Sequence, residues 1–224
     1  MTWNIHGSAK PSLRGLAEWI EGCGVSLLFL QEVQQRQAAR LAEMLGWTSQ
    51  RWSLKHAPVV KPPEGMAILS TYPITALTTT VLSGRVLPTN YRRRIAQRAT
   101  LQLPKQDVSV CNVHLASGNT DERPGQVVRL QKVLAGVSVL GGDFNDKPFS
   151  ETLESLTRLG FQRAESDPTA WAIRDGSGLP SLVIDHILVR SETSIQRART
   201  FSHDEVRELR KLSDHLPVVA QLNW

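Results

Sequence analysis

A short apolar run leads into two glycines and an acid in the stretch Val137-Ser138-Val139-Leu140-Gly141-Gly142-Asp143-Phe144-Asn145. The apolar residues predict a buried strand that runs into Gly141-Gly142-Asp143. Asp143 and Asn145 then stand where the chain leaves the core. By itself, Asp143-Phe144-Asn145 is also a common turn sequence. This stretch therefore predicts a central strand whose end carries polar side chains.

The same arrangement recurs along the chain. Leu27-Leu28-Phe29-Leu30 ends in Gln31-Glu32, and Asp185 lies inside the apolar run from Ile184 to Val189. Further polar groups at strand positions are Asn4 on the first strand, His114 after Val110-Cys111-Asn112-Val113, and Asp214-His215 before the last strand. Several carboxylates meeting at one sheet edge repel one another unless a cation lies between them. Oxygen ligands without cysteine favour Mg²⁺ or Mn²⁺ over zinc.

Each of these residues also has an ordinary structural explanation. Glu32 could be a surface residue, and Asp185 could protect a sheet edge from aggregation. His114 alone is more often a hydrogen-bonded core histidine than a catalyst. Asp214 and His215 could form a local ion pair before Pro217. The occurrence of all these residues in this order favours a functional site over five unrelated structural explanations.

The rest of the pattern predicts a mixed α/β fold. Helical spacing of apolar residues follows Ser12 and again precedes Gly46, on either side of the Leu27–Leu30 run. Strand-like runs at 66–70, 76–82, 94–103 and 108–115 predict an antiparallel meander. A helix after Ser150 is expected to turn Leu153, Leu156 and Leu159 inward, and the last strands are expected at 182–189 and 217–222. So many strands favour two packed sheets within one domain that spans residues 1–224.

Positive charge is concentrated in one segment. The net charge is +5 and the pI about 9.6, which favours an anionic partner. Arg85, Arg92, Arg93, Arg94 and Arg98 lie within fourteen residues without an acid, with Tyr91 among them, and Lys55, His56 and Lys61 add charge upstream. A footprint for a phosphate backbone and a solvated basic edge strand both explain such a cluster. Arg92, Arg93 and Arg98 are the candidate substrate-binding residues.

The cysteines and apolar runs limit what else the chain can be. Cys23 and Cys111 are far apart and lack metal-binding spacing, which favours two reduced buried thiols over a disulfide. No apolar run approaches the ~20 residues of a membrane span. No secretory signal is visible, so a cytoplasmic location is favoured unless the start is trimmed.

The ordered motifs resemble those of the endonuclease/exonuclease/phosphatase superfamily, to which deoxyribonuclease I belongs. They are Trp3-Asn4-Ile5-His6-Gly7, Leu30-Gln31-Glu32-Val33, Gly65-Met66-Ala67-Ile68-Leu69-Ser70, Asn112-Val113-His114-Leu115, Gly141-Gly142-Asp143-Phe144-Asn145, Ile184-Asp185-His186-Ile187-Leu188 and Ser213-Asp214-His215-Leu216-Pro217. The resemblance runs from Thr2 to Leu222. It implies a four-layer α/β/β/α sandwich of two packed mixed β-sheets with helices outside, and an active site at one end of the sheets.

The resemblance also implies roles for the acidic and amide residues. Glu32 is implied as the principal metal ligand, with Asn4 beside it and Asp214 as a further ligand of the metal or its water. Asp143 is implied to orient or deprotonate the attacking water, and Asn145 to hold a phosphate oxygen. Phosphodiester hydrolysis needs a positioned water and compensation for charge on the phosphoryl oxygens, which these residue types with Mg²⁺ or Mn²⁺ supply.

The histidines receive roles in the same way. His215, paired with Asp185, is implied to bind the phosphate or act as a base, and His114 is a candidate acid for the leaving oxygen. Two departures argue against a dedicated abasic-site repair enzyme: His6 stands where those enzymes have an acid, and Leu115-Ala116-Ser117 lacks the Pro-Asn that follows their tyrosine.

The substrate is less constrained than the reaction, because the superfamily also contains phosphatases and lipid phosphodiesterases. The basic pI and the arginine cluster favour a nuclease, with DNA ahead of RNA as the substrate. The alternative is a phosphatase or phosphodiesterase acting on a small-molecule, inositol-phosphate or lipid substrate. The sequence contains no amphipathic basic helix that would indicate stable membrane association. We expect the protein to be a monomer.

Overall fold

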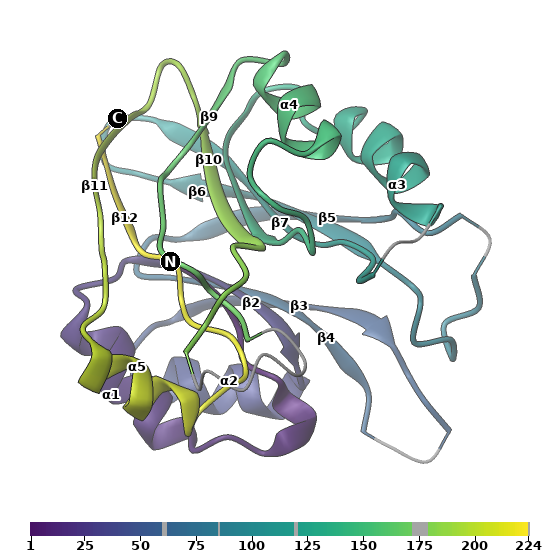
Figure 1. The fold of residues 1–224 in the computed structure, drawn as a ribbon. Coiled ribbons are helices and arrows are strands. Elements are labelled where there is room, and N and C mark those ends of the chain that lie inside the picture. Colours follow the sequence, from purple (N-terminus) through teal and green to yellow (C-terminus); the bar gives the residue numbers. More distant parts are fainter. Residues whose placement is uncertain (60–61, 85, 119–120, 172–178, 224) are drawn as a thin grey trace.

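The strands form two main sheets and a separate two-stranded sheet in the structure, a computed structural model that describes residues 1–59, 62–84, 86–118, 121–171 and 179–223 (Figure 1). The four-stranded sheet has the order β1 (Thr2–Asn4), β2 (Leu27–Val33), β4 (Glu64–Ser70), β3 (Ser49–His56). The six-stranded sheet has the order β5 (Ile74–Val81), β6 (Ile95–Gln102), β7 (Asp107–His114), β8 (Val137–Asp143), β10 (Asp185–Arg190), β9 (Phe161–Arg163). The two-stranded sheet pairs β11 (Ser194–Ala198) with β12 (Ala220–Asn223) in antiparallel orientation.

Helices cover the outer face of each sheet (Figure 1). On the four-stranded side lie the short 3₁₀ helix η1 (Gly7–Ala9), α1 (Leu13–Gly22), α2 (Gln35–Met44) and α5 (His203–Arg210); on the six-stranded side lie α3 (Glu122–Gln131) and α4 (Glu151–Thr157). Among the described residues, no helix is long and apolar enough to cross a membrane.

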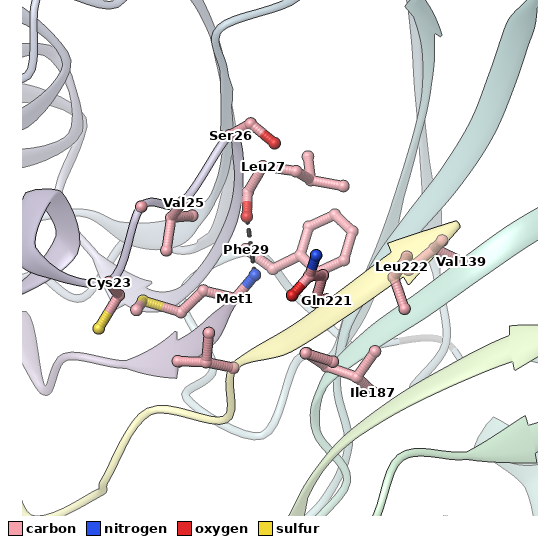
Figure 2. A pocket seen from close by; sticks show the side chains of 13 residues that line it. Met1, Cys23, Val25, Ser26, Leu27, Phe29, Val139, Ile187, Gln221 and Leu222 are labelled. Carbon is pink, nitrogen blue, oxygen red and sulfur yellow. Dashed lines mark hydrogen bonds between the residues drawn. The ribbon is translucent and has the colours of Figure 1, made fainter. Parts of the chain in front are cut away.

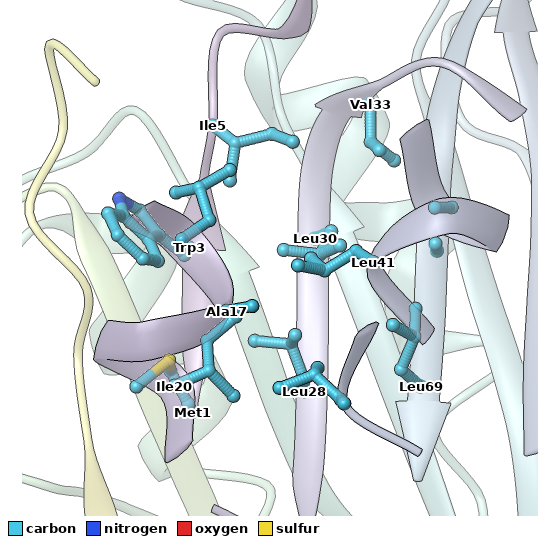
Figure 3. Close-up of a cluster of buried hydrophobic side chains, with 14 of the residues drawn as sticks. Met1, Trp3, Ile5, Ala17, Ile20, Leu28, Leu30, Val33, Leu41 and Leu69 are labelled. Atoms are coloured by element: carbon cyan, nitrogen blue, oxygen red, sulfur yellow. The ribbon is translucent and has the colours of Figure 1, made fainter. Parts of the chain in front are cut away.

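Three apolar clusters hold the layers together. The first joins β1, β2 and β4 to α1, α2 and α5, and Figure 3 shows Leu28, Leu30 and Leu69 of these strands beside Ile20 and Leu41 of the helices. The second joins the six-stranded sheet to α3 and α4, and the third lies between the two sheets. The four-layer sandwich that the resemblance implied is therefore confirmed.

The expected helices form where capping and periodicity predicted them. Ser12 accepts a hydrogen bond from the backbone N–H of Gly15 at the start of α1, and Ser150 accepts one from Leu153 at the start of α4. Helix α4 ends at Thr157, however, and Leu159 lies beyond it, 39% exposed. The expectation that Leu159 packs inward is wrong, because a residue past the last turn no longer follows the helical face.

Several elements were not predicted. Strand β3 is mostly polar, because it lies at the edge of its sheet and shows only part of each face to the core. Strand β9, strand β11 and helix α5 were missed as well, and the strand predicted at 182–189 begins only at Asp185. Short or edge elements bury few side chains, so they leave a weak apolar pattern.

The two cysteines lie far apart, and both are free thiols. Cys111 is buried, as expected, and burial raises its pKa to about 12. Cys23 is only partly buried. The structure pairs neither cysteine in a disulfide, and the expected burial is confirmed only for Cys111.

Candidate active site

Three strands of the six-stranded sheet bring His114, Asp143 and Asp185 into one row. Strands β7 and β8 are parallel and pair His114 with Asp143, while β8 and β10 are antiparallel and pair Asp143 with Asp185. Gly142 makes this close pairing possible. Its φ is +151°, and a Cβ there would collide with the carbonyl of Val113 on the neighbouring strand. The glycine in the Gly-Gly-Asp motif is thus a packing requirement beside the site.

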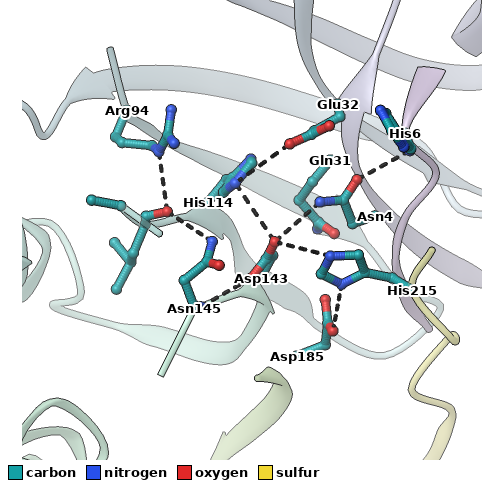
Figure 4. Close-up of polar contacts among 12 residues, drawn as sticks. Asn4, His6, Gln31, Glu32, Arg94, His114, Asp143, Asn145, Asp185 and His215 are labelled. Carbon is teal, nitrogen blue, oxygen red and sulfur yellow. Dashed lines mark hydrogen bonds and ion pairs between the residues drawn. The ribbon is translucent and has the colours of Figure 1, made fainter. Parts of the chain in front are cut away.

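The four-stranded sheet meets this row through Asn4. The side-chain amide of Asn4 donates to Asp143 Oδ2 at 3.0 Å, and its Oδ1 accepts from the backbone of His6 at 3.1 Å (Figure 4). Deeper between the sheets, the Gln31 amide donates to Asn112 Oδ1 at 2.7 Å. Asn112 in turn donates to the carbonyls of Leu30 and Ala67. These buried amides fix how the two sheets sit at the site, and sequence reasoning did not identify Gln31 or Asn112 in that role.

A loop anchored to β1 places His215 beside the row of His114, Asp143 and Asp185. The Trp3 indole donates to the His215 carbonyl at 2.9 Å, and Ser213 Oγ donates to the Asn4 carbonyl at 2.7 Å. The His215 ring then donates from Nδ1 to Asp185 Oδ2 at 2.8 Å, and its Nε2 lies 3.9 Å from Asp143 Oδ2 (Figure 4). The pairing of His215 with Asp185 that the resemblance implied is present in the structure.

Three side chains at the site are carried on left-handed backbone. His6, Glu32 and Asn145 have φ values of 45°, 53° and 51°. The register between β2 and β4 shifts between Leu30 and Val33, so Glu32 lies in a bulge. Residues other than glycine adopt this conformation at a cost and do so most often at functional sites. The bulge turns Glu32 out of the strand alternation, and its Oε1 lies 3.9 Å from His114 Nε2.

Asn145 is held on the opposite side of Asp143 from Asn4. Its backbone N–H donates to Asp143 Oδ1 at 2.9 Å, and its side-chain amide donates to the Leu115 carbonyl at 3.1 Å. Together with Asn4, this bond fixes both oxygens of Asp143.

Burial and neighbouring charges shift the pKa values of Asp143, His215 and His114 in different directions. Burial, with Asp185 next, raises the pKa of Asp143 to about 7. Burial alone would lower the pKa of His215, but Asp185 and Asp143 together raise it to about 10. Burial, followed by Lys55 and Arg94, lowers the pKa of His114 well below its ordinary value. Near neutral pH the site therefore holds an imidazolium at His215, a neutral imidazole at His114, and an acid at Asp143 able to exchange a proton.

The donor set suits a hard cation. Ligand atoms of Asp143, Asp185 and His215 lie within 4.8 Å of one another. Asp185 Oδ1 is buried and has no hydrogen-bond partner among the described residues. Two buried carboxylates with an unsatisfied oxygen fit a divalent ion that prefers oxygen ligands. Glu32 and Asp214, expected as metal ligands, are not part of this group, and Asn4 donates its amide to Asp143.

Asp214 lies at the mouth of the site, 60% exposed in its side chain, with Oδ2 3.3 Å from His6 Nδ1. His6 thus stands beside the expected ligand Asp214, at the position that distinguished this chain from abasic-site endonucleases.

The arginine segment does not act as one surface. The side chain of Arg92 is 62% exposed, and its Nη1 lies 3.8 Å from Glu122 Oε1. Arg93 instead donates from Nη1 to the carbonyls of Leu54 and Lys55. Arg98 donates to Ser109 Oγ and the Val133 carbonyl, so the structure does not bring it to the site. Of the upstream basic residues, Lys55 and His56 are buried. Arg85 and Lys61 lie outside the described residues.

Sequence reasoning did not single out Arg94. It is 7% exposed, and its Nε donates at 3.0 Å to the same Leu115 carbonyl that Asn145 binds (Figure 4). The available signal was its place directly before strand β6, where a side chain leaves the sheet toward the same end as His114.

A separate cavity of about 400 Å³ lies between the sheets and is lined by none of these residues (Figure 2). Its walls include Phe29, Val139 and Ile187, and the Met1 amino group beside it donates to the Leu27 carbonyl at 2.8 Å. No acid or histidine lines it, so it offers none of the groups that hydrolysis needs.

Comparison with known proteins places this fold and motif order in a family. The sequence matches the model of the Endonuclease/Exonuclease/phosphatase family over residues 1–215. No curated protein gives a significant match.

Solved structures resemble the chain over nearly its full length. An endonuclease/exonuclease/phosphatase family protein from Leptotrichia buccalis is 18% identical, with a TM-score of 0.79 and coverage of 100% of this chain and 98% of that one. The mannosyl-6-phosphatase Bt3783 of Bacteroides thetaiotaomicron is 15% identical, with a TM-score of 0.78 and coverage of 100% and 98%. The 3′ phosphatase NExo from Neisseria, bound to a product DNA hairpin, is 23% identical, with a TM-score of 0.74 and the same coverage.

Proposed function

Because this chain belongs to the Endonuclease/Exonuclease/phosphatase family, whose members hydrolyse phosphoester bonds, we propose that it is a divalent-metal-dependent phosphodiester hydrolase acting on nucleic acid, with DNA favoured. The observation that carries the proposal is the chain of contacts from Asp185 through His215 to Asp143, with His114 on the other side of Asp143. One buried acid flanked by two differently charged imidazoles suits in-line attack of water on a phosphoryl group.

Asp143 is the group that takes the proton from the attacking water. With a pKa of about 7 it is poised to accept and release a proton near neutral pH. Hydrogen bonds from Asn4 and the Asn145 backbone hold its two oxygens in place. The side chain of Asn145, fixed through Leu115, stands beside it to hold a phosphoryl oxygen.

His215 binds the charged phosphoryl group. Asp185 fixes the ring by accepting from Nδ1, so Nε2 points to Asp143 and the space beyond it. The raised pKa of His215 keeps the ring cationic, which suits charge compensation on a phosphoryl oxygen.

His114 meets the leaving oxygen as a neutral ring. Because the pKa of His114 is lowered, the ring is not protonated to imidazolium at neutral pH. The neutral ring therefore stabilises the charge that develops on the leaving oxygen by donating a hydrogen bond. This differs from the general acid implied by the resemblance, because burial beside Lys55 and Arg94 disfavours the charged ring.

A Mg²⁺ or Mn²⁺ ion held by Glu32 and Asp214, as the resemblance implies, would polarise the phosphate and compensate its charge. These carboxylates supply the oxygen ligands that such an ion prefers.

Nucleic acid is favoured as the substrate by the net charge of +5 and by the exposed side chain of Arg92. The decisive experiment offers purified protein with Mg²⁺ or Mn²⁺ a panel of supercoiled plasmid, linear duplex, single-stranded DNA, RNA, an inositol phosphate and a sugar phosphate. Cleavage of the nucleic acids alone supports the proposal. Hydrolysis of only the small phosphates would replace it with the phosphatase alternative.

A further inference from the structure

Arg94 is a nearly buried cation that contacts only backbone carbonyls. Its Nε donates to Leu115 at 3.0 Å, and its Nη1 donates to Tyr91 at 2.7 Å and to Arg93 at 3.3 Å. Its Nη2 makes no hydrogen bond to any residue that the structure describes. The side chain thus keeps one pair of donor hydrogens uncommitted.

Unlike comparable cations nearby, Arg94 has no counter-ion at contact distance. Lys55, also buried, has Glu64 Oε1 at 2.6 Å, and Arg123 has Asp146 Oδ2 at 3.4 Å. Over the described part of the chain, no carboxylate comes within ion-pair distance of the Arg94 guanidinium. A guanidinium does not lose its proton in proteins, and a buried charge without a partner is costly. The carboxylates of Asp143, Glu32, Glu64 and Glu122 act on this charge only from beyond contact distance. An anion from outside would make the direct contact that none of them makes.

The location of Arg94 says where that anion would bind. The Leu115 carbonyl accepts from both Arg94 Nε and the Asn145 amide, and the Leu115 N–H donates to the Asp143 carbonyl (Figure 4). One peptide group therefore connects the guanidinium, the amide and the central acid. An anion at the free edge of Arg94 would lie beside the catalytic residues on the side of Asn145.

We propose that Arg94 is a further substrate-binding residue: together with the Asn145 amide, already assigned to a phosphoryl oxygen, it forms an anion subsite for a phosphoryl group of the substrate. The guanidinium fork matches two oxygens of a phosphate, which a lysine in its place would not. That the bound anion is part of a substrate rests on the proposed function; the anion subsite itself requires no catalysis and is tested without it. The competing explanation gives Arg94 only a structural role, in which its hydrogen bonds hold residues 91–93 against Leu115.

The test measures binding of inorganic phosphate to metal-free protein in EDTA, at constant ionic strength set with chloride. A ligand that binds only the folded state raises Tm with its concentration, so the phosphate dependence of Tm reports affinity. Wild type, Arg94→Met, Arg94→Lys and the control Arg98→Met are compared. Arg98 is a matched control because it lies on β6 and also donates to a carbonyl, but away from the site.

We expect phosphate to raise Tm for wild type and Arg98→Met, and Arg94→Met to bind phosphate at least about tenfold more weakly. Arg94→Lys keeps the charge without the fork and is expected to lie between them; it also serves if Arg94→Met does not fold. If Arg94 had only a structural role, the Arg94 variants would have a lower Tm without phosphate, and the increase of Tm with phosphate would be the same as in wild type. That result, or no phosphate response in wild type, overturns the proposal.

Hydrolysis assays on the same proteins separate this inference from the proposed function. If wild type binds phosphate through Arg94 but cleaves no phosphodiester in the panel, the function fails and the subsite stands. If wild type cleaves nucleic acid while Arg94→Met binds phosphate like wild type, the function stands and the subsite fails.

Discussion

Changing Asp185 to asparagine is the sharpest test of the catalytic arrangement. The carboxylate is fully buried, and its Oδ2 accepts from His215 Nδ1 at 2.8 Å. The amide keeps the shape but removes the charge, and it can present an N–H to the ring where an acceptor is needed. The imidazole then loses both its orientation and its main reason to stay charged.

The expected size of the effect follows from this one bond. A hydrogen bond to a charged group contributes about 1.5–3 kcal/mol, and each 1.36 kcal/mol is a tenfold change in rate, so Asp185→Asn should lower kcat about 10- to 150-fold. His215→Ala should lose at least as much. The double variant should lose little more than His215→Ala alone, because Asp185 acts through the ring.

A pH titration adds a readout that general damage to the fold would not reproduce. In metal-free wild type the pKa of His215 is about 10, with Asp185 the strongest of the carboxylates that raise it. Without that charge, burial should lower the pKa of His215, which NMR of the imidazole would detect. Asp107→Asn, an exposed change at the far end of β7, is the control and should alter neither property. Multiplicative losses in the double variant, or an unchanged His215 pKa in Asp185→Asn, would refute the pairing.

Four further predictions follow from the same structure. EDTA should abolish hydrolysis and Mg²⁺ or Mn²⁺ restore it; full activity in excess EDTA would end the metal-dependent mechanism. Arg92→Ala should weaken binding to long nucleic acid and shallow its log–log salt dependence by about one, with cleavage of bis-p-nitrophenyl phosphate unchanged; identical plasmid cleavage at every salt concentration would count against a nucleic-acid footprint. Gly142→Ala should cost more than about 2 kcal/mol of stability in denaturant unfolding, because its Cβ would meet the Val113 carbonyl; an unchanged midpoint would contradict this. Metal-free protein should lose Tm as the pH rises from about 8 toward 10, since the raised pKa of His215 stabilises the fold only while the ring is protonated, whereas the lowered pKa of the Met1 amino group acts in the opposite direction only below about pH 8; a Tm that rises from pH 8 to 10 would have the wrong sign.

Local patterns in the sequence were enough for the core of the fold. Helices α1 and α4 follow from serine caps and apolar spacing, and β2 and β8 follow from short apolar runs. These signals are strong because each element buries one face or both. Edge strand β3 gave a weak signal because the residues it buries are mostly polar, and helix α5 because most of its side chains face solvent.

The sequence by itself determined which residue types the site would use, because acids and histidines at the ends of apolar runs need a reason to be there. Only the tertiary structure decided how they are grouped. Register placed Asp143 beside both His114 and Asp185, and a bulge turned Glu32 toward His114. The arginines show the limit most clearly. The sequence favoured Arg92, Arg93 and Arg98 as substrate-binding residues, yet contacts from other strands and loops commit Arg98 to the outer face of its sheet and hold Arg94 beside the catalytic group. Neighbours distant in sequence set burial and partners, and burial and partners decide what a charged side chain can do.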